Sequence, residues 1–168
     1  MLLNSKLKTN IINEVQNILI QIDNLFSSKE NIDKIVQEVI NNYFLKLLKV
    51  CLKLFIERLD EEIKDSPIIR QEWKVVRKDY RKLLTPYCEI EYVRRYYRNK
   101  NTKEYCYLVD QMLGIDKYQR ITDSLEKKII ELSKNLSYEE VIKEISKNNI
   151  ELTLSKQTIK NKKQKKRE

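Results

Sequence analysis

Apolar side chains recur at spacings of three and four through the first 65 residues, which is the period of amphipathic helices. The first stretch ends at Phe26, and Ser27 and Glu30 then form an S-x-x-E capping box that predicts the start of a second helix. The second stripe continues to Ile63, and a helix that reached Asp65 would be roughly 50 Å long at 1.5 Å per residue. We expect a helical hairpin over residues 1–65, in which either an intramolecular core or a homodimer buries the remaining apolar surface.

The pattern changes over residues 66–120. The stretch WKVVRKDYRKLL fits a short helix or an irregular strand, and the Thr85-Pro86 pair that follows it predicts a turn. The next stretch, CEIEYVRRYYRN, alternates as a strand does, and the polar loop NKNTK separates it from EYCYLVD. We therefore expect a basic segment whose β-hairpin joins the last two stretches. This hairpin is the main non-helical part of a fold that we expect to be mainly α with a small β-hairpin.

Three short helices are expected over residues 121–161. Asp123 and Glu126 are placed to cap the first, and Ser137 and Glu140 form a capping box for the second. This order of helices is that of a helix-turn-helix domain, although a plain helical bundle needs the same caps. The connection between the last two helices is also longer than in a compact helix-turn-helix.

The last of these helices has polar side chains of the kind that contact DNA. A recognition helix places its N-terminal residues at base edges in the major groove. Gln157 and Asn161 can pair with adenine, while lysines can reach guanine or phosphate. Residues 162–168 form a basic tail suited to phosphate contacts. The candidate DNA-contacting residues here are Ser155, Lys156, Gln157, Thr158, Lys160, Asn161, Lys162 and Lys163.

The positive charge is concentrated in two places. Of the formal +9, residues 66–120 carry 13 basic and 7 acidic side chains, and residues 160–168 carry 6 and 1. Localised positive charge suits a polyanion, because each neutralised phosphate releases counterions, although a solvated surface is the simpler alternative. Arg94, Arg95 and Arg98 are interleaved with tyrosines, and we expect these arginines to contact nucleic acid. The tyrosines are better explained as strand residues with a polar edge.

Several function classes are disfavoured. The three cysteines form no CxxC pair and the chain has no histidine, so neither a zinc site nor a histidine-activated nucleophile is expected. No apolar run approaches the ~20 residues of a transmembrane helix, and no signal peptide is recognisable. We expect a cytoplasmic, nucleoid-associated protein with no cofactor, no metal, no catalytic residues and no small-molecule substrate.

The succession VVRKDYRKLLTPYCEIEYVRRYYRNK, EYCYLVDQMLGID, LSYEEVIKEIS and LSKQTIKN resembles the N-terminal half of the ISLre-type insertion-sequence transposases. That group is also labelled simply as an uncharacterised protein family. The resemblance covers Val75 to Asn161, and it departs from the family pattern at Cys88, where a glycine is expected. It implies a following RNase H-like domain with two catalytic metal ions, whereas here only the basic tail follows Asn161.

We therefore expect the double-stranded DNA-binding portion of a truncated transposase, which recognises the ends of its element and has no enzymatic activity of its own. Two alternatives stay open. One is a short dimeric repressor of the element, and the other is a helical interaction protein without DNA specificity.

Overall fold

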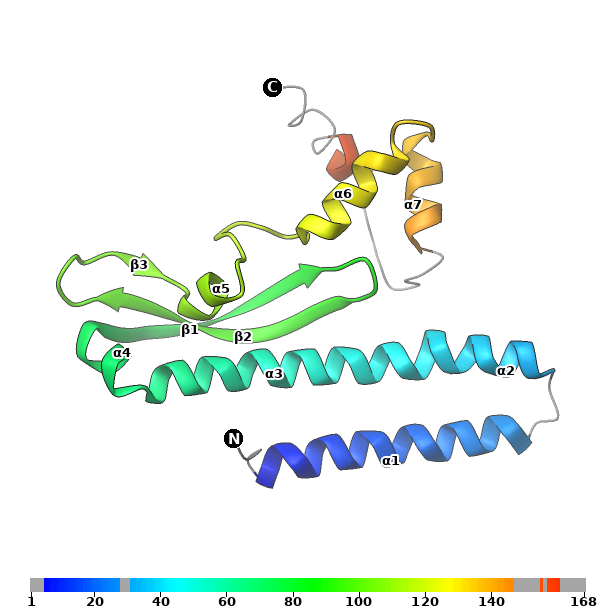
Figure 1. The fold of residues 1–168 in the computed structure, drawn as a ribbon, viewed down its shortest axis with the longest axis horizontal. Helices are drawn as coiled ribbons and strands as arrows, with labels where there is room; N and C mark the ends of the chain where they lie inside the picture. Colours follow the sequence, from blue (N-terminus) through cyan, green and yellow to red (C-terminus); the bar gives the residue numbers. More distant parts are fainter. Residues whose placement is uncertain (1–4, 28–30, 147–154, 156, 161–168) are drawn as a thin grey trace. The chain divides into compact units, whose positions relative to one another are not determined.

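The computed structural model describes residues 5–27, 31–146, 155 and 157–160. The chain divides into two compact units, Met1–Leu54 and Phe55–Glu168. The fold is mainly α with a small antiparallel sheet, as the sequence predicts (Figure 1). The predicted boundary at residue 65 differs from the observed one, because the last turns of the second long helix pack with the sheet.

The first unit contains α1 (Ser5–Ser27), α2 (Ile32–Glu38), the π-helical segment η1 (Val39–Phe44) and the first half of α3 (Leu45–Asp65). The second helical stretch thus reaches Asp65, as predicted, but a π-helical segment interrupts its α-helical period.

The predicted capping box at Ser27 is wrong. Ser27 is the last residue of α1, and its hydroxyl donates to the Asp23 carbonyl at 3.0 Å. Asn31 caps α2 instead, and its side-chain oxygen accepts from the Asp33 N–H at 2.9 Å. Glu30, the other half of the predicted box, lies outside the described residues.

The described part of the first unit has little core of its own. Among its described side chains Ile35 is the buried apolar one. Self-association through residues 1–65 stays a prediction, and these exposed side chains are its motivation. The exposed large apolar residues of this unit are Ile12, Leu19, Ile20, Ile32, Val36, Ile40 and Phe44.

The second unit is built on a sheet of order β1-β2-β3, formed by β1 (Trp73–Leu84), β2 (Glu89–Asn99) and β3 (Tyr105–Cys106). The short helix α4 (Pro67–Glu72) precedes β1, with proline at its first position, where a missing N–H costs nothing. β1 and β2 pair antiparallel along their whole length, with one register shift in β1. That bulge explains why the alternation of WKVVRKDYRKLL looks irregular in the sequence.

The predicted hairpin is therefore corrected. The main partner of residues 89–99 is the preceding stretch, and β3 adds only two paired residues. The stretch LVDQM does not continue the strand, because it forms α5 (Leu108–Met112) and buries Val109 and Asp110. At the turn, the Thr85 hydroxyl accepts from the Cys88 N–H at 3.0 Å and donates to the Cys88 carbonyl at 2.8 Å.

Both faces of β2 are covered. On one face, Asp60 of α3 pairs with the Arg95 guanidinium at 2.5 Å. On the other face, Asp110 of α5 accepts from the Tyr92 hydroxyl at 3.0 Å. Side chains from both faces of β2 are buried, and Tyr92 and Tyr97 are fully buried.

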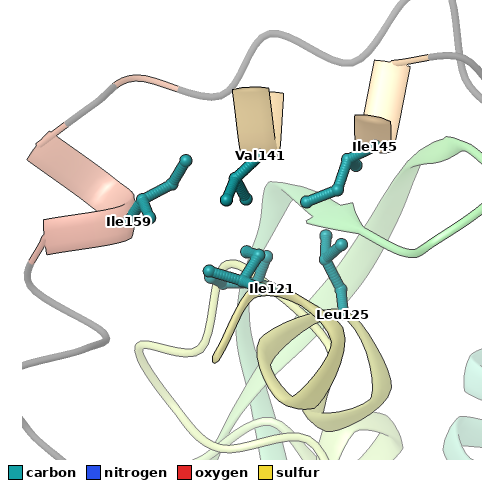
Figure 2. Packing of buried hydrophobic residues seen from close by; sticks show 6 residues of the cluster. Ile121, Leu125, Val141, Ile145 and Ile159 are labelled. Carbon is teal, nitrogen blue, oxygen red and sulfur yellow. The ribbon is translucent and has the colours of Figure 1, made fainter. Parts of the chain in front are cut away.

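Three helical segments at the other end of the chain share one apolar core. They are α6 (Asp123–Leu132), α7 (Tyr138–Ser146) and the helical turn at residues 157–160. Figure 2 shows how the core side chains point toward one another from these segments. The fully packed members are Ile121, Leu125, Ile129, Val141, Ile145 and Ile159.

This helical core is attached directly to the sheet. The Leu84 N–H donates to the Arg120 carbonyl, and the Thr122 N–H donates to the Leu84 carbonyl, each at 2.9 Å. Thr122 is the N-cap residue of α6, so the predicted cap at Asp123 is wrong. Asp123 instead accepts from the Gln119 side-chain amide at 2.7 Å.

The capping box predicted for α7 is confirmed. The Ser137 N–H donates to the Glu140 carboxylate at 2.8 Å, and the Glu140 N–H donates to the Ser137 hydroxyl at 3.4 Å. The hydrogen bond from the Ser137 backbone holds the pKa of the Glu140 carboxyl below its ordinary value. The Glu140 carboxylate therefore stabilises the fold fully at pH values above the pKa of glutamate in the unfolded chain. This stabilisation is lost as the pH falls through the lower pKa of the folded state.

We expect Glu140→Gln to lower the melting temperature at about pH 7, because the charged acceptor of the capping box is lost. The difference from wild type should shrink as the pH falls below the ordinary glutamate pKa of about 4.3, where the wild-type carboxylate also becomes protonated. Thermal melts by circular dichroism at several pH values measure this. Glu131→Gln, at an exposed position near the end of α6, is the control. A difference that stays constant down to about pH 3 would contradict the role of the charge.

Candidate nucleic-acid interface

The last helical turn has its cap in place and one side anchored. The Ser155 hydroxyl accepts from the Thr158 N–H at 3.2 Å, so the predicted cap is confirmed. Ile159 is fully buried in the helical core, and this anchoring leaves Gln157 and Lys160 exposed while Thr158 is half-buried. The side chains that we expect to contact DNA thus include two on an exposed surface.

Four other members of the predicted contact set lie outside the described residues, namely Lys156, Asn161, Lys162 and Lys163. The common core of the three helical segments is compatible with a helix-turn-helix, and DNA contact by these residues stays a prediction.

Arg95 is a buried structural residue. Its Nη1 lies 2.5 Å from the Asp60 carboxylate, its Nη2 pairs with Glu61, and its backbone N–H donates to Asp60 at 3.2 Å. The α3 carboxylates thus compensate the cost of burying a guanidinium. Arg95 holds α3 against the sheet, and this geometry does not offer its charge to a phosphate.

Arg94 lies on the opposite face and is also buried. Its guanidinium pairs with Asp110 and stacks over the Tyr107 ring at 3.5 Å from the ring centroid. The expectation that Arg94 and Arg95 lie on a nucleic-acid-binding surface is therefore corrected, because α3 covers Arg95 and α5 with Tyr107 covers Arg94. Arg98 is exposed and stays a candidate.

Asp110 is the centre of a buried charge cluster that the sequence analysis did not find. Its carboxylate accepts from Arg81 Nη1 at 2.8 Å, in addition to the hydrogen bond from Tyr92 and the ion pair with Arg94. Asp110 lies within YLVDQMLGID, one of the stretches that carries the family resemblance. This position in a family stretch was the one sequence signal that Asp110 matters. Its partners could not be predicted, because tertiary contacts bring them to Asp110.

Arg81 also fixes the connection between α5 and α6. Its Nη2 donates to the carbonyls of Asp116 at 2.8 Å and Gln119 at 2.5 Å. Because α6 begins at Asp123, just after this connection, the cluster positions the helical core relative to the sheet.

The sheet face that α5 covers is open at the end that carries β3. We call this surface the open sheet end, and its residues are Lys74, Arg77, Tyr96, Arg98 and Tyr105. Cross-strand pairing places Lys74 opposite Arg98, Arg77 opposite Tyr96, and Arg98 opposite Tyr105. All five side chains therefore lie on one face.

Arginine and tyrosine side chains alternate in contact at the open sheet end. Arg77 lies over the Tyr96 ring at 4.4 Å from the centroid, and Tyr96 stacks on Tyr105 with centroids 5.5 Å apart. Arg98 lies over the Tyr105 ring at 5.7 Å. Lys74 and Arg77 were missed in the sequence analysis, because their stretch was left open between helix and strand.

Asp79 adjoins this surface. The Arg77 Nε donates to its carboxylate at 2.9 Å, and the Tyr107 hydroxyl donates to it at 2.7 Å. These hydrogen bonds, that from Arg77 first, hold the pKa of Asp79 below its ordinary value although partial burial opposes them. Asp79 is therefore ionised at neutral pH and offsets part of the charge of Arg77.

Within the described ranges, no group of three cysteine, aspartate or glutamate side chains is arranged to hold a metal ion. None of the helices described has the length and apolar character needed to cross a membrane.

These features define a small, basic, mainly α protein with an antiparallel sheet that supports three short helices. The family model described as "Uncharacterised protein family (UPF0236)" matches residues 21–166, and the chain belongs to this family. This confirms the resemblance to an uncharacterised family, whereas the link to ISLre-type transposases stays a prediction. No solved structure matches the chain.

Relatives occur in Caldanaerobacter subterraneus subsp. tengcongensis. The UPF0236 protein TTE2489 is 33% identical over 152 residues, covering 90% of this chain and 32% of the relative. The UPF0236 protein TTE1650/TTE2708 is 33% identical over 152 residues, which are 90% of this chain and 30% of that relative. The chain thus spans about a third of the length of the curated relatives it matches.

Proposed function

We propose that this chain is a DNA-binding segment of an insertion-sequence transposase, and that it recognises the ends of its element as double-stranded DNA. The observation that carries the proposal is the capped helical turn at residues 157–160, which is anchored by Ile159 and exposes Gln157 and Lys160. A short helix with a buried apolar anchor and exposed amide and amino groups has the features of a helix that enters the major groove.

The names of the relatives support a mobile element. One UPF0236 protein of Caldanaerobacter has a name that joins eleven designations, and another has a name that joins four. We interpret each designation as a separate gene copy. Many copies of one gene in a single genome are typical of a mobile element.

The charge of the chain supports a polyanionic partner. The formal net charge is +9 with a sequence pI of about 9.3. Non-specific attraction to phosphate holds such a protein on DNA while the recognition helix samples base edges.

Replacing Gln157 with alanine is expected to cost ~1–3 kcal/mol of binding free energy on the recognised site and little on random DNA. The lost group is an amide that can pair bidentately with adenine, so the site preference should relax. Fluorescence anisotropy with duplexes from the flanks of the gene, and with random duplexes of the same length, measures both affinities.

Gln111→Ala is the matched control, because Gln111 is an exposed glutamine on α5. If wild type and Gln157→Ala prefer the recognised site equally, a residue other than Gln157 must recognise the DNA sequence. Absence of any DNA binding at low salt would instead favour a helical interaction protein.

A further inference from the structure

We propose that the open sheet end is a second DNA-contact surface, which holds the phosphodiester backbone about one helical turn away from the site read by the last helix. This inference rests on the proposed function and extends it, because it assigns a base-independent contact and a minimum length of DNA. The position, the charge and the rigidity of this surface support the inference.

The position follows from the length of β1. Leu84, at one end of β1, is hydrogen-bonded to the start of α6, whereas Lys74 lies ten residues away near the other end. At ~3.3 Å per residue, a strand separates these two positions by roughly 33 Å. One turn of B-DNA is about 34–36 Å long. Leu84 packs against the helical core that anchors the last helical turn through Ile159. A duplex contacted at that turn and running parallel to β1 would therefore present the same side of its backbone again near the open sheet end.

The charge of this surface favours phosphate. The open sheet end carries three basic side chains, those of Lys74, Arg77 and Arg98, and the adjoining Asp79 leaves a local excess of +2. Lys74 and Arg98 are exposed on the same face, and the Arg77 side chain is 55% exposed. The covered part of this face differs, because its arginines, Arg81 and Arg94, are buried against Asp110.

The rigidity of this surface reduces the cost of binding. The rings of Tyr96 and Tyr105 stack on each other, and the Arg77 and Arg98 guanidiniums lie over these two rings. An arginine already held over a ring loses less side-chain entropy when it meets a phosphate. Guanidinium N–H groups form bidentate hydrogen bonds with phosphate oxygens.

The experiment compares the full chain with the double variant Lys74→Gln/Arg98→Gln on two duplexes. One duplex carries the recognised site with about 15 bp of flanking DNA on each side, and the other carries about 4 bp, so only the first provides a full turn beyond the site. The double variant leaves the Arg77–Asp79 pair in place, and circular dichroism confirms that it is folded. The control variant removes the charges of Lys34, Lys46 and Lys53 in the first unit.

On the long duplex, the double variant is expected to bind roughly ten- to a hundredfold more weakly than wild type at about 0.1 M salt. The slope of log affinity against log salt should become shallower by up to about 1.8, which is ~0.9 for each lost phosphate contact. On the short duplex, the two proteins should bind alike. The preference for the recognised site over random DNA should be unchanged, since phosphate contacts do not read sequence.

Three results would overturn the inference while the proposed function stands. The double variant could bind the long duplex with the affinity and salt slope of wild type, or it could lose the same affinity on both duplexes. The control variant could also lose as much affinity as the double variant. Failure of the wild-type chain to bind any duplex would overturn the proposed function itself.

Discussion

Replacing Asp110 with asparagine is expected to lower the free energy of unfolding of the second unit by about 3–5 kcal/mol. Asparagine has nearly the same shape and keeps an oxygen acceptor, so the substitution removes mainly the charge. Asp110 is 2% exposed and faces two guanidiniums, those of Arg81 and Arg94, which are also buried. Without this carboxylate, the two buried guanidiniums lose their shared partner and repel each other.

Urea denaturation followed by the fluorescence of Trp73 measures this loss, because Trp73 is the single tryptophan of the chain and lies at the start of β1. Glu104→Gln is the control: Glu104 is an exposed carboxylate, and its substitution should change stability by less than about 0.5 kcal/mol. A loss below about 1 kcal/mol for Asp110→Asn would mean that water solvates the two arginines.

The local features of the fold were the most predictable. The capping box at Ser137 and the cap at Ser155 are confirmed, because a cap needs only residues within three positions of each other. The same rule failed at Ser27 and Asp123: the Asn31 side chain caps α2 instead, and Thr122 occupies the N-cap position of α6 without a side-chain capping hydrogen bond. Capping motifs thus predict that a helix begins nearby, but several polar residues can compete for the same role.

The burial of the arginines was not predictable from local sequence. Arg95 is 35 residues from Asp60, its partner on α3, and Arg81 is 29 residues from Asp110. An arginine in a strand has the same local signature whether it meets a phosphate or a buried carboxylate. The packing of α3 and α5 against the two faces of β2 decided the outcome. The surface arginine Arg77 was not predicted, because the pattern of its stretch fits a helix as well as an irregular strand.

The relation between the sheet and the helical core decides how the second unit unfolds. Backbone hydrogen bonds join Leu84 to Arg120 and Thr122, and Arg81 binds the carbonyls of the connection before α6. Leu84 also packs against the helical core. These contacts lead us to expect that the sheet and the helical core unfold as one cooperative unit. A substitution that destabilises the helical core should then destabilise the sheet as well.

Replacing Ile129 with alanine tests this coupling. Ile129 is fully buried among the core residues of α6 and α7, so the lost methyl groups and the cavity should cost about 2–5 kcal/mol. If the unit is cooperative, the urea midpoint of Trp73 fluorescence should shift by the corresponding amount, although Trp73 lies at the other end of β1 from the helical core.

Ile142→Ala is the matched control for Ile129→Ala, because Ile142 is half-buried at the edge of the same core and should cost less. An unchanged Trp73 transition in Ile129→Ala, combined with lost DNA binding, would show that the helices unfold separately from the sheet. In that case, the roughly 33 Å spacing set by β1 could not hold the two DNA-contact surfaces one turn apart. A shared transition would instead support the sheet as the rigid spacer between them.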